Sequence, residues 1–261
     1  MDIGLIFKEI PSWATYVGTT VIVLISIYSG FMLARSRKKL NEKDVESPIN
    51  TVVGATLALL AFIMAFTFGV VTSRFDTRRE LMLDEVNAIE TTYLRTSVIP
   101  EPHRSEVRAL LKQYVDTRVE VMKDPGKVAQ VIERSQQLQR KIWAHAEELA
   151  QADLKNPDIV SLFVDSVNQM FELHTKRVTV GLITRLPPLM WIILYVLTIL
   201  SMFEVGYLFG ISGRTNWPLI LVLSLAFSSV ILIIADLDRS TGMIRVNPKP
   251  TFDLQLRISG R

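Results

Sequence analysis

Long apolar runs alternate with charged segments along the chain. The four runs are residues 12–34, 51–73, 183–210 and 217–235. At a rise of 1.5 Å per residue, the roughly 23 uncharged residues of the second run extend about 34 Å as a helix, enough to cross a hydrocarbon layer of about 30 Å. The pattern therefore predicts four transmembrane helices, in two hairpins within residues 1–73 and 183–237.

The second run continues into a charged segment, residues 74–98, without an intervening Pro or Gly. Apolar side chains recur there at the heptad spacing of a helix, at Met82, Val86, Ile89 and Tyr93. We therefore predict one long helix over residues 51–98, with its first half in lipid and its second half in water.

Residues 74–182 form a polar block with nearly equal numbers of acidic and basic side chains. Turn signals divide it into four helical pieces, at Pro100 and Pro102, at Asp124-Pro125-Gly126, and at Asn156-Pro157. The third piece carries the stripe Val131, Ser135, Leu138, Ile142, His145 and Leu149, and the fourth carries Val160, Phe163, Val167, Met170 and His174. Four amphipathic pieces with short connections predict an antiparallel four-helix bundle.

The predicted fold is therefore an all-α membrane protein with four transmembrane helices and a four-helix extramembrane bundle inserted between spans two and three. Residues 41–50 are expected to form a short polar linker. Pro187-Pro188 either begins the third span or kinks it. The tail, residues 238–261, contains Pro248 and Pro250 and is expected to be extended.

The amino-acid composition narrows the classes of function that the chain can have. The chain is 49% hydrophobic and has no cysteine, which excludes disulfides and thiolate chemistry. Its three histidines are well apart in sequence, and no second ligand is spaced for zinc around His145. Neither a nucleophile elbow nor a phosphate loop is present, so we predict no enzyme, no metal and no cofactor. Basic residues largely flank the apolar runs, which indicates contact with lipid headgroups and not with nucleic acid.

Ala58, Phe62, Phe66 and Val70 share one face of the second span. Two large rings on such a stripe would form a hydrophobic constriction if several copies surrounded an axis. Helix packing or lipid contact is the more common explanation of such a stripe. The same span carries many small residues, a signal of close helix packing: Gly54, Ala55, Ala58, Ala61, Ala65 and Gly69.

Four polar residues are candidates for a site at the membrane edge: Arg74, Glu204, Asp236 and Asp238. Glu204 lies inside the third span, either at mid-bilayer depth or at the headgroup level. Asp236 and Asp238 close the fourth span. They could bind a cation through oxygen atoms, pair with a base such as Arg74, or simply end the helix. Glu85 and its polar neighbours are expected to form a solvated or salt-bridged helix face.

The distribution of basic residues gives a divided answer on orientation. The cluster RSRKK after the first span places that end inside, whereas the total count places residues 74–182 inside.

Several segments resemble the bacterial bestrophin-like domain family. They are RSRKK, GATLALLAFIMAFTFGVV, DEVNAIETTY with VIPEP, YLFG, and the ending DLDRSTGMIRVNPKPTF. LLAFIMAFTFGVVTSRF is similar to the neck helix of bestrophin anion channels, which aligns Ala58, Phe62 and Phe66 with the neck. The resemblance implies a homo-oligomer, a pentamer in bestrophins, in the bacterial inner membrane, with a pore for small anions and a cytoplasmic helical block.

A different function stays open from the residues alone. Helices strung between two membrane spans are also the architecture of receptor input modules. A non-conducting sensor or scaffold, with the block facing the periplasm, is the alternative hypothesis.

Overall fold

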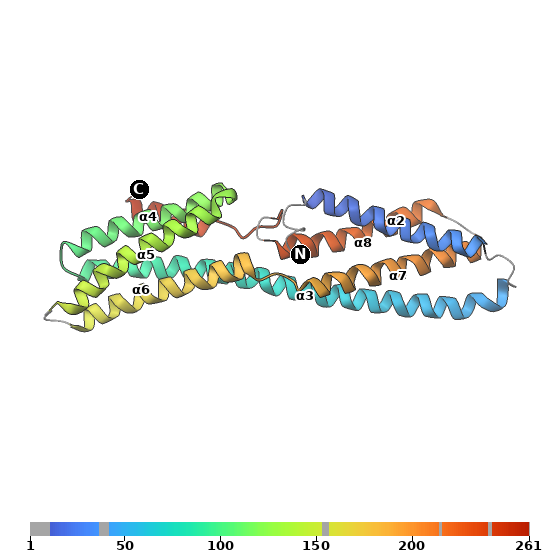
Figure 1. Cartoon of the computed structure of the whole chain (residues 1–261), viewed down its shortest axis with the longest axis horizontal. Coiled ribbons are helices and arrows are strands. Elements are labelled where there is room, and N and C mark those ends of the chain that lie inside the picture. The colour runs from blue at the N-terminus through green and yellow to red at the C-terminus, as the bar shows by residue number, and fades with distance from the viewer. Residues whose placement is uncertain (1–10, 37–41, 153–156, 214–215, 240–241, 261) are drawn as a thin grey trace. The chain divides into compact units, whose positions relative to one another are not determined.

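The computed structural model describes residues 11–36, 42–152, 157–213, 216–239 and 242–260 (Figure 1). Within this part the chain is helical and contains no strand. The α-helices are α2 Ser12–Ser36, α3 Glu42–Arg95, α4 His103–Lys123, α5 Val128–Gln151, α6 Pro157–Val178, α7 Pro188–Ser212, α8 Trp217–Asp238 and α9 Lys249–Ser259. Short helical turns follow α3 at Thr96–Val98, precede α5 at Pro125–Lys127 and follow α6 at Thr179–Ile183.

Four helices are long and apolar enough to cross a membrane. They are α2, the segment Ile49–Val98 that contains the apolar part of α3, α7 and α8. These helices agree with the four predicted spans. The predicted long helix is also confirmed as far as Arg95, because α3 passes Ser73 without interruption.

Three predicted boundaries were wrong. The linker expected at residues 41–50 is mostly helix, because α3 already begins at Glu42. The third span begins at Pro188 and not at residue 183, since the first positions of a helix need no backbone N–H donor and accept proline. The tail is not extended throughout, because α9 occupies Lys249–Ser259.

Contacts divide the chain into a first unit, Met1–Phe75 with Arg185–Arg245, and a second unit, Asp76–Thr184 with Val246–Arg261. In the first unit, α2 packs along α7 and against α8. Its buried core draws on all four candidate spans, with Ile27, Leu60, Leu194 and Ile231 nearly or fully inaccessible.

The contact between α2 and α7 is unusually close because glycines replace side chains there. A Cβ atom on Gly30 would lie 2.0 Å from the carbonyl oxygen of Phe203, and one on Gly206 would lie 1.9 Å from that of Ile27. Gly210 stands one turn further along against Ala34. Small residues at this spacing let two helix backbones meet in lipid. The glycines of the second span behave differently, because a Cβ atom on Gly54 or Gly69 would have no neighbour within 4 Å.

In the second unit, the end of α3 and helices α4, α5, α6 and α9 contribute to one hydrophobic cluster. All five residues of the predicted α6 stripe are buried. On α5, the buried stripe includes Ala146 in place of the predicted His145, because Ala146 lies a full helical turn beyond Ile142. Leu254 and Ile258 of α9 join the cluster, which explains why the end of the chain is helical.

Candidate functional site

The predicted stripe on the second span lies on the open side of α3. Phe62 is 67% exposed and Phe66 58% exposed; Ala58 is exposed and Val70 half-buried. The opposite face of the same helix is packed, with Val53, Leu60, Met64 and Val71 buried. The helix therefore presents bulky rings outward while a different face holds it to its neighbours.

Small residues lie on the same open face as the two rings. Ala55, Ala65 and Gly69 are exposed. Each lies three or seven residues from Phe62 or Phe66, and a helical period of 3.6 residues brings such positions to the same side. Beside this face, α3 and α8 border a groove of about 520 Å³. The groove is lined by Ala61, Met64, Ala65, Phe68, Ala226, Phe227, Val230 and Ile233. Since all of these side chains are apolar, the groove suits a lipid chain or another apolar helix, not a polar ligand.

Three of the four predicted membrane-edge residues lie near one end of the first unit. Arg74 Nη1 lies 3.8 Å from Asp238 Oδ1, which also accepts a hydrogen bond from the backbone N–H of Leu186 at 2.9 Å. The guanidinium of Arg185 donates to the backbone carbonyl of Asp238. These contacts join α3, just beyond its apolar run, and the residues that precede α7 to the end of α8.

Asp236 is almost fully buried and serves as an acceptor for three donors. Its Oδ1 accepts from Ser12 Oγ at 2.9 Å and from the N–H of Met243 at 2.8 Å, and its Oδ2 accepts from the N–H of Ile244 at 2.7 Å. The carboxylate therefore anchors the chain that follows α8. Because both oxygens are engaged by N–H and O–H donors, this residue is not arranged as a cation ligand.

Glu204 does not join this group. It is half-buried in α7 and accepts a hydrogen bond from Thr56 Oγ1, near the beginning of the apolar run of α3. Arg74 and Thr56 stand near opposite ends of that run. The four predicted residues thus belong to two places in the first unit.

The second unit contains a buried charged network that the sequence did not reveal. Glu85, on α3 beyond the apolar run, is fully buried and accepts a hydrogen bond from Arg118 Nε on α4 at 3.0 Å. A second arginine, Arg177 of α6, also donates to its carboxylate. Arg118 in turn contacts His174 Nδ1 and Tyr114 Oη, each at 2.6 Å. Glu85 was expected on a solvated or salt-bridged face, and it is salt-bridged but inside the unit.

Electrostatic interactions explain how the buried side chains of this network remain charged. Burial opposes ionisation of Glu85, but the positive charges of Arg118 and Arg177 and hydrogen bonding outweigh it and hold the pKa of the carboxyl well below its usual range. Burial lowers the pKa of His174 and raises the pKa of Tyr114 to about 12. The network therefore contains an ionised carboxylate between cations, with a neutral imidazole and a neutral phenol beside it. Nothing in it resembles a nucleophile paired with a base.

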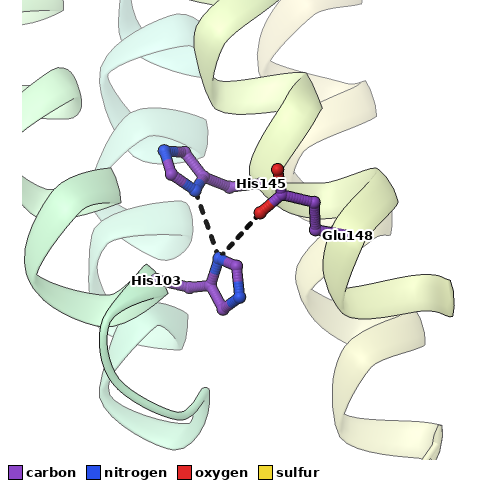
Figure 2. A group of neighbouring side chains, drawn as sticks. All are labelled: His103, His145 and Glu148. Carbon is purple, nitrogen blue, oxygen red and sulfur yellow. Dashed lines mark hydrogen bonds and ion pairs between the residues drawn. The ribbon is translucent and has the colours of Figure 1, made fainter. Parts of the chain in front are cut away.

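A group of potential metal ligands lies elsewhere in the second unit. His103 at the start of α4 faces His145 and Glu148 near the end of α5 (Figure 2). His145 was expected on an apolar stripe, with no second ligand spaced for zinc around it. Its partner comes from a different helix, which local spacing cannot reveal.

Comparison with known proteins identifies a family that this chain matches. A family model described as Bestrophin-like domain matches residues 14–251, which includes every residue of the open α3 stripe and of the membrane-edge group. Neither a curated protein nor a solved structure shows a significant match. Since the family model covers most of the chain and the structure supplies its helical, membrane-compatible body, this chain belongs to the Bestrophin-like domain family.

Proposed function

We propose that the chain is a subunit of a homo-oligomeric pore in the bacterial inner membrane, permeable to small anions, with α3 lining the conducting path. The observation that carries this proposal is the open face of α3. Two phenylalanines stand out from it one helical turn apart, while the opposite face is packed within the subunit. In a ring of copies, such residues would form two successive apolar collars.

The small residues around the two rings support the same arrangement. A helix that carried bulky side chains all around could not approach its copies closely, whereas Ala and Gly between the rings permit it. Apolar collars of this kind gate by dewetting, because a narrow hydrophobic segment holds a continuous water column only when it widens. Phe62 and Phe66 are therefore the proposed gate, with Ala58 and Val70 lining the path on either side.

Membership of the Bestrophin-like family supports an anion as the permeant species. A pentamer and a cytoplasmic second unit follow from the resemblance to bestrophins. A reporter fused after residue 261 would test the orientation, since four membrane crossings would put residues 1 and 261 and the second unit on one side.

Chloride flux from liposomes containing the purified protein tests the proposal. Wild-type protein should release chloride, and Phe62→Ala or Phe66→Ala should raise the flux because a smaller side chain widens the collar. Phe68→Ala is the matched control: Phe68 is on the same helix but lines the groove against α8. Equal flux in wild type and both collar variants would refute the gate. No flux at all would refute the pore and leave the sensor or scaffold as the remaining function.

A further inference from the structure

Helices α4 and α5 carry the same short pattern at the level where they face each other. On α4, His103 is followed three residues later by Glu106, and on α5, His145 is followed three residues later by Glu148. Residues three apart share one side of a helix. Since the short connection between the two helices makes them antiparallel, the start of α4 meets the end of α5 (Figure 1).

The two imidazole rings point nitrogen to nitrogen. His103 Nδ1 lies 3.2 Å from His145 Nδ1, and the same atom of His103 lies 3.8 Å from Glu148 Oε2 (Figure 2). One atom from each of the three side chains falls within 4.8 Å of the others. In a tetrahedral site with Zn–N bonds of about 2.05 Å, neighbouring ligand atoms are separated by about 3.3 Å. The histidine pair therefore already has the separation of two zinc ligands, and the exposed Glu148 side chain needs only a small movement to complete the group.

Glu106 supplies the supporting contact that metal-binding histidines usually have. Its Oε2 lies 3.5 Å from His145 Nε2, the ring nitrogen that faces away from His103. A carboxylate at this position favours the proton on Nε2 and so leaves the Nδ1 lone pair directed at the cluster. The carboxylate, imidazole and metal position then form the arrangement that fixes ring orientation in zinc proteins.

The composition of the cluster selects the class of ion. Two imidazoles and one carboxylate suit Zn²⁺ and its first-row neighbours, whereas Mg²⁺ and Ca²⁺ require a shell of oxygen atoms. The two histidine side chains retain 19% and 18% of their exposure, so an ion can enter from water and keep water as a fourth ligand.

We propose that His103, His145 and Glu148 form a binding site for a divalent transition-metal ion of the zinc class, with Glu106 positioning His145. The ion would join the start of α4 to the end of α5. This inference is independent of the proposed pore, because all four residues belong to the second unit.

Zinc binding by the full-length protein tests the site. The protein is purified in detergent without a polyhistidine tag, treated with a chelator and titrated with ZnCl₂, with bound metal counted by elemental analysis. One Zn²⁺ should bind per chain with micromolar or tighter affinity, and Mg²⁺ or Ca²⁺ should not compete. His103→Ala, His145→Ala and Glu148→Gln should each weaken binding at least tenfold. Glu106→Gln should weaken it by roughly 10- to 100-fold, as loss of an orienting carboxylate does.

Glu147→Gln is the matched control, since Glu147 is adjacent to Glu148 but contacts Trp143 instead of the cluster. It should bind Zn²⁺ as the wild type does. A second readout guards against loss of the fold: Zn²⁺ should raise the thermal unfolding temperature of the wild type and of Glu147→Gln, but not that of Glu148→Gln, whose exposed side chain is not needed for packing. Absence of binding to the wild type, or equal binding to the double variant His103→Ala/His145→Ala, would overturn the site and leave the two rings as a hydrogen-bonded pair.

Discussion

Glu85 Oε1 accepts a hydrogen bond from Arg118 Nε at 3.0 Å, and both side chains are buried. The pair joins α3 to α4 in a part of the chain whose other buried contacts are mostly apolar. Two buried charges offset each other only while both are present, because either one alone has lost its water without gaining a partner. The Glu85 carboxylate therefore contributes strongly to the stability of the second unit.

Glu85→Ala should destabilise the protein by about 3–5 kcal/mol, since Arg118 remains buried without its anion. The measurement is the unfolding transition of the purified protein in detergent. Glu90→Ala is the comparison on the same helix: Glu90 pairs with the exposed Arg257, and loss of a surface pair costs at most about 1 kcal/mol. Similar losses in the two variants would contradict the importance assigned to the buried network.

Acid should destabilise the protein in two steps. The pKa of His174 is lowered from 6.5, so the folded state binds fewer protons than the unfolded chain once the pH falls below about 6.5. The pKa of Glu85 is lowered from 4.5, which adds a second loss below about pH 4.5. In both cases the unfolded state takes up protons first, so the free energy of unfolding decreases as the pH falls. Unfolding temperatures measured from pH 8 down to about pH 2.5 should show both steps, and His174→Gln should remove the upper one. A curve without a decrease toward acid would refute both assignments.

The spans and most helices of the second unit follow from the sequence because their signals are local. Apolar length gives α2, α7 and α8, and the spacing of Val160, Phe163 and Val167 gives the buried face of α6. Helix α9 was not predicted, because Pro248 and Pro250 suggested an extended tail. In the structure these prolines stand at the beginning of the helix, where a missing N–H costs little.

Gly206 should not tolerate a side chain. Its missing Cβ would lie 1.9 Å from the carbonyl oxygen of Ile27, so Gly206→Val would force α2 away from α7 and cost about 3 kcal/mol or more. The unfolding temperature and the yield of monodisperse protein in detergent measure the effect. Gly54→Ala is the matched control, because nothing lies within 4 Å of the position its Cβ would take. Full stability of Gly206→Val would show that the two helices are not in backbone contact.

The candidate sites were harder to predict than the helices because they depend on contacts between distant segments. Arg74 and Asp238 could be proposed as partners, since both stand where an apolar run ends. The contact between His103 and His145 joins two helices across 42 residues, so the second histidine cannot be found from local spacing, and the His145/Glu148 pair alone does not distinguish a metal site from a surface pair. Glu85 was expected on a solvated or salt-bridged face, and its burial could not be predicted because the arginines that pair with it come from other helices.

Asp236→Asn should weaken the attachment of the chain that follows α8. An amide group can accept from one backbone N–H, but its NH₂ would then face the donor that Asp236 Oδ2 now satisfies on Ile244. Leaving a buried donor without an acceptor costs about 1–3 kcal/mol. Hydrogen exchange at the backbone amides of Met243 and Ile244 should speed up, while Asp76→Asn, an exposed position on α3, should leave it unchanged. Unaltered protection of both amides would show that the carboxylate does not hold this segment.

Water should reach the open face of α3 if that face lines a pore, and lipid should cover it if it does not. The chain has no cysteine, so single substitutions Phe62→Cys and Phe66→Cys introduce the one thiol of each variant. A charged, membrane-impermeant thiosulfonate should modify both thiols and change the chloride flux, because a thiolate forms only where water is present. Val222→Cys on α8, which is 62% exposed, is the control for a lipid-facing position and should stay unmodified. Equal protection of residues 62, 66 and 222 would place the two phenylalanines against lipid and remove α3 from the conducting path.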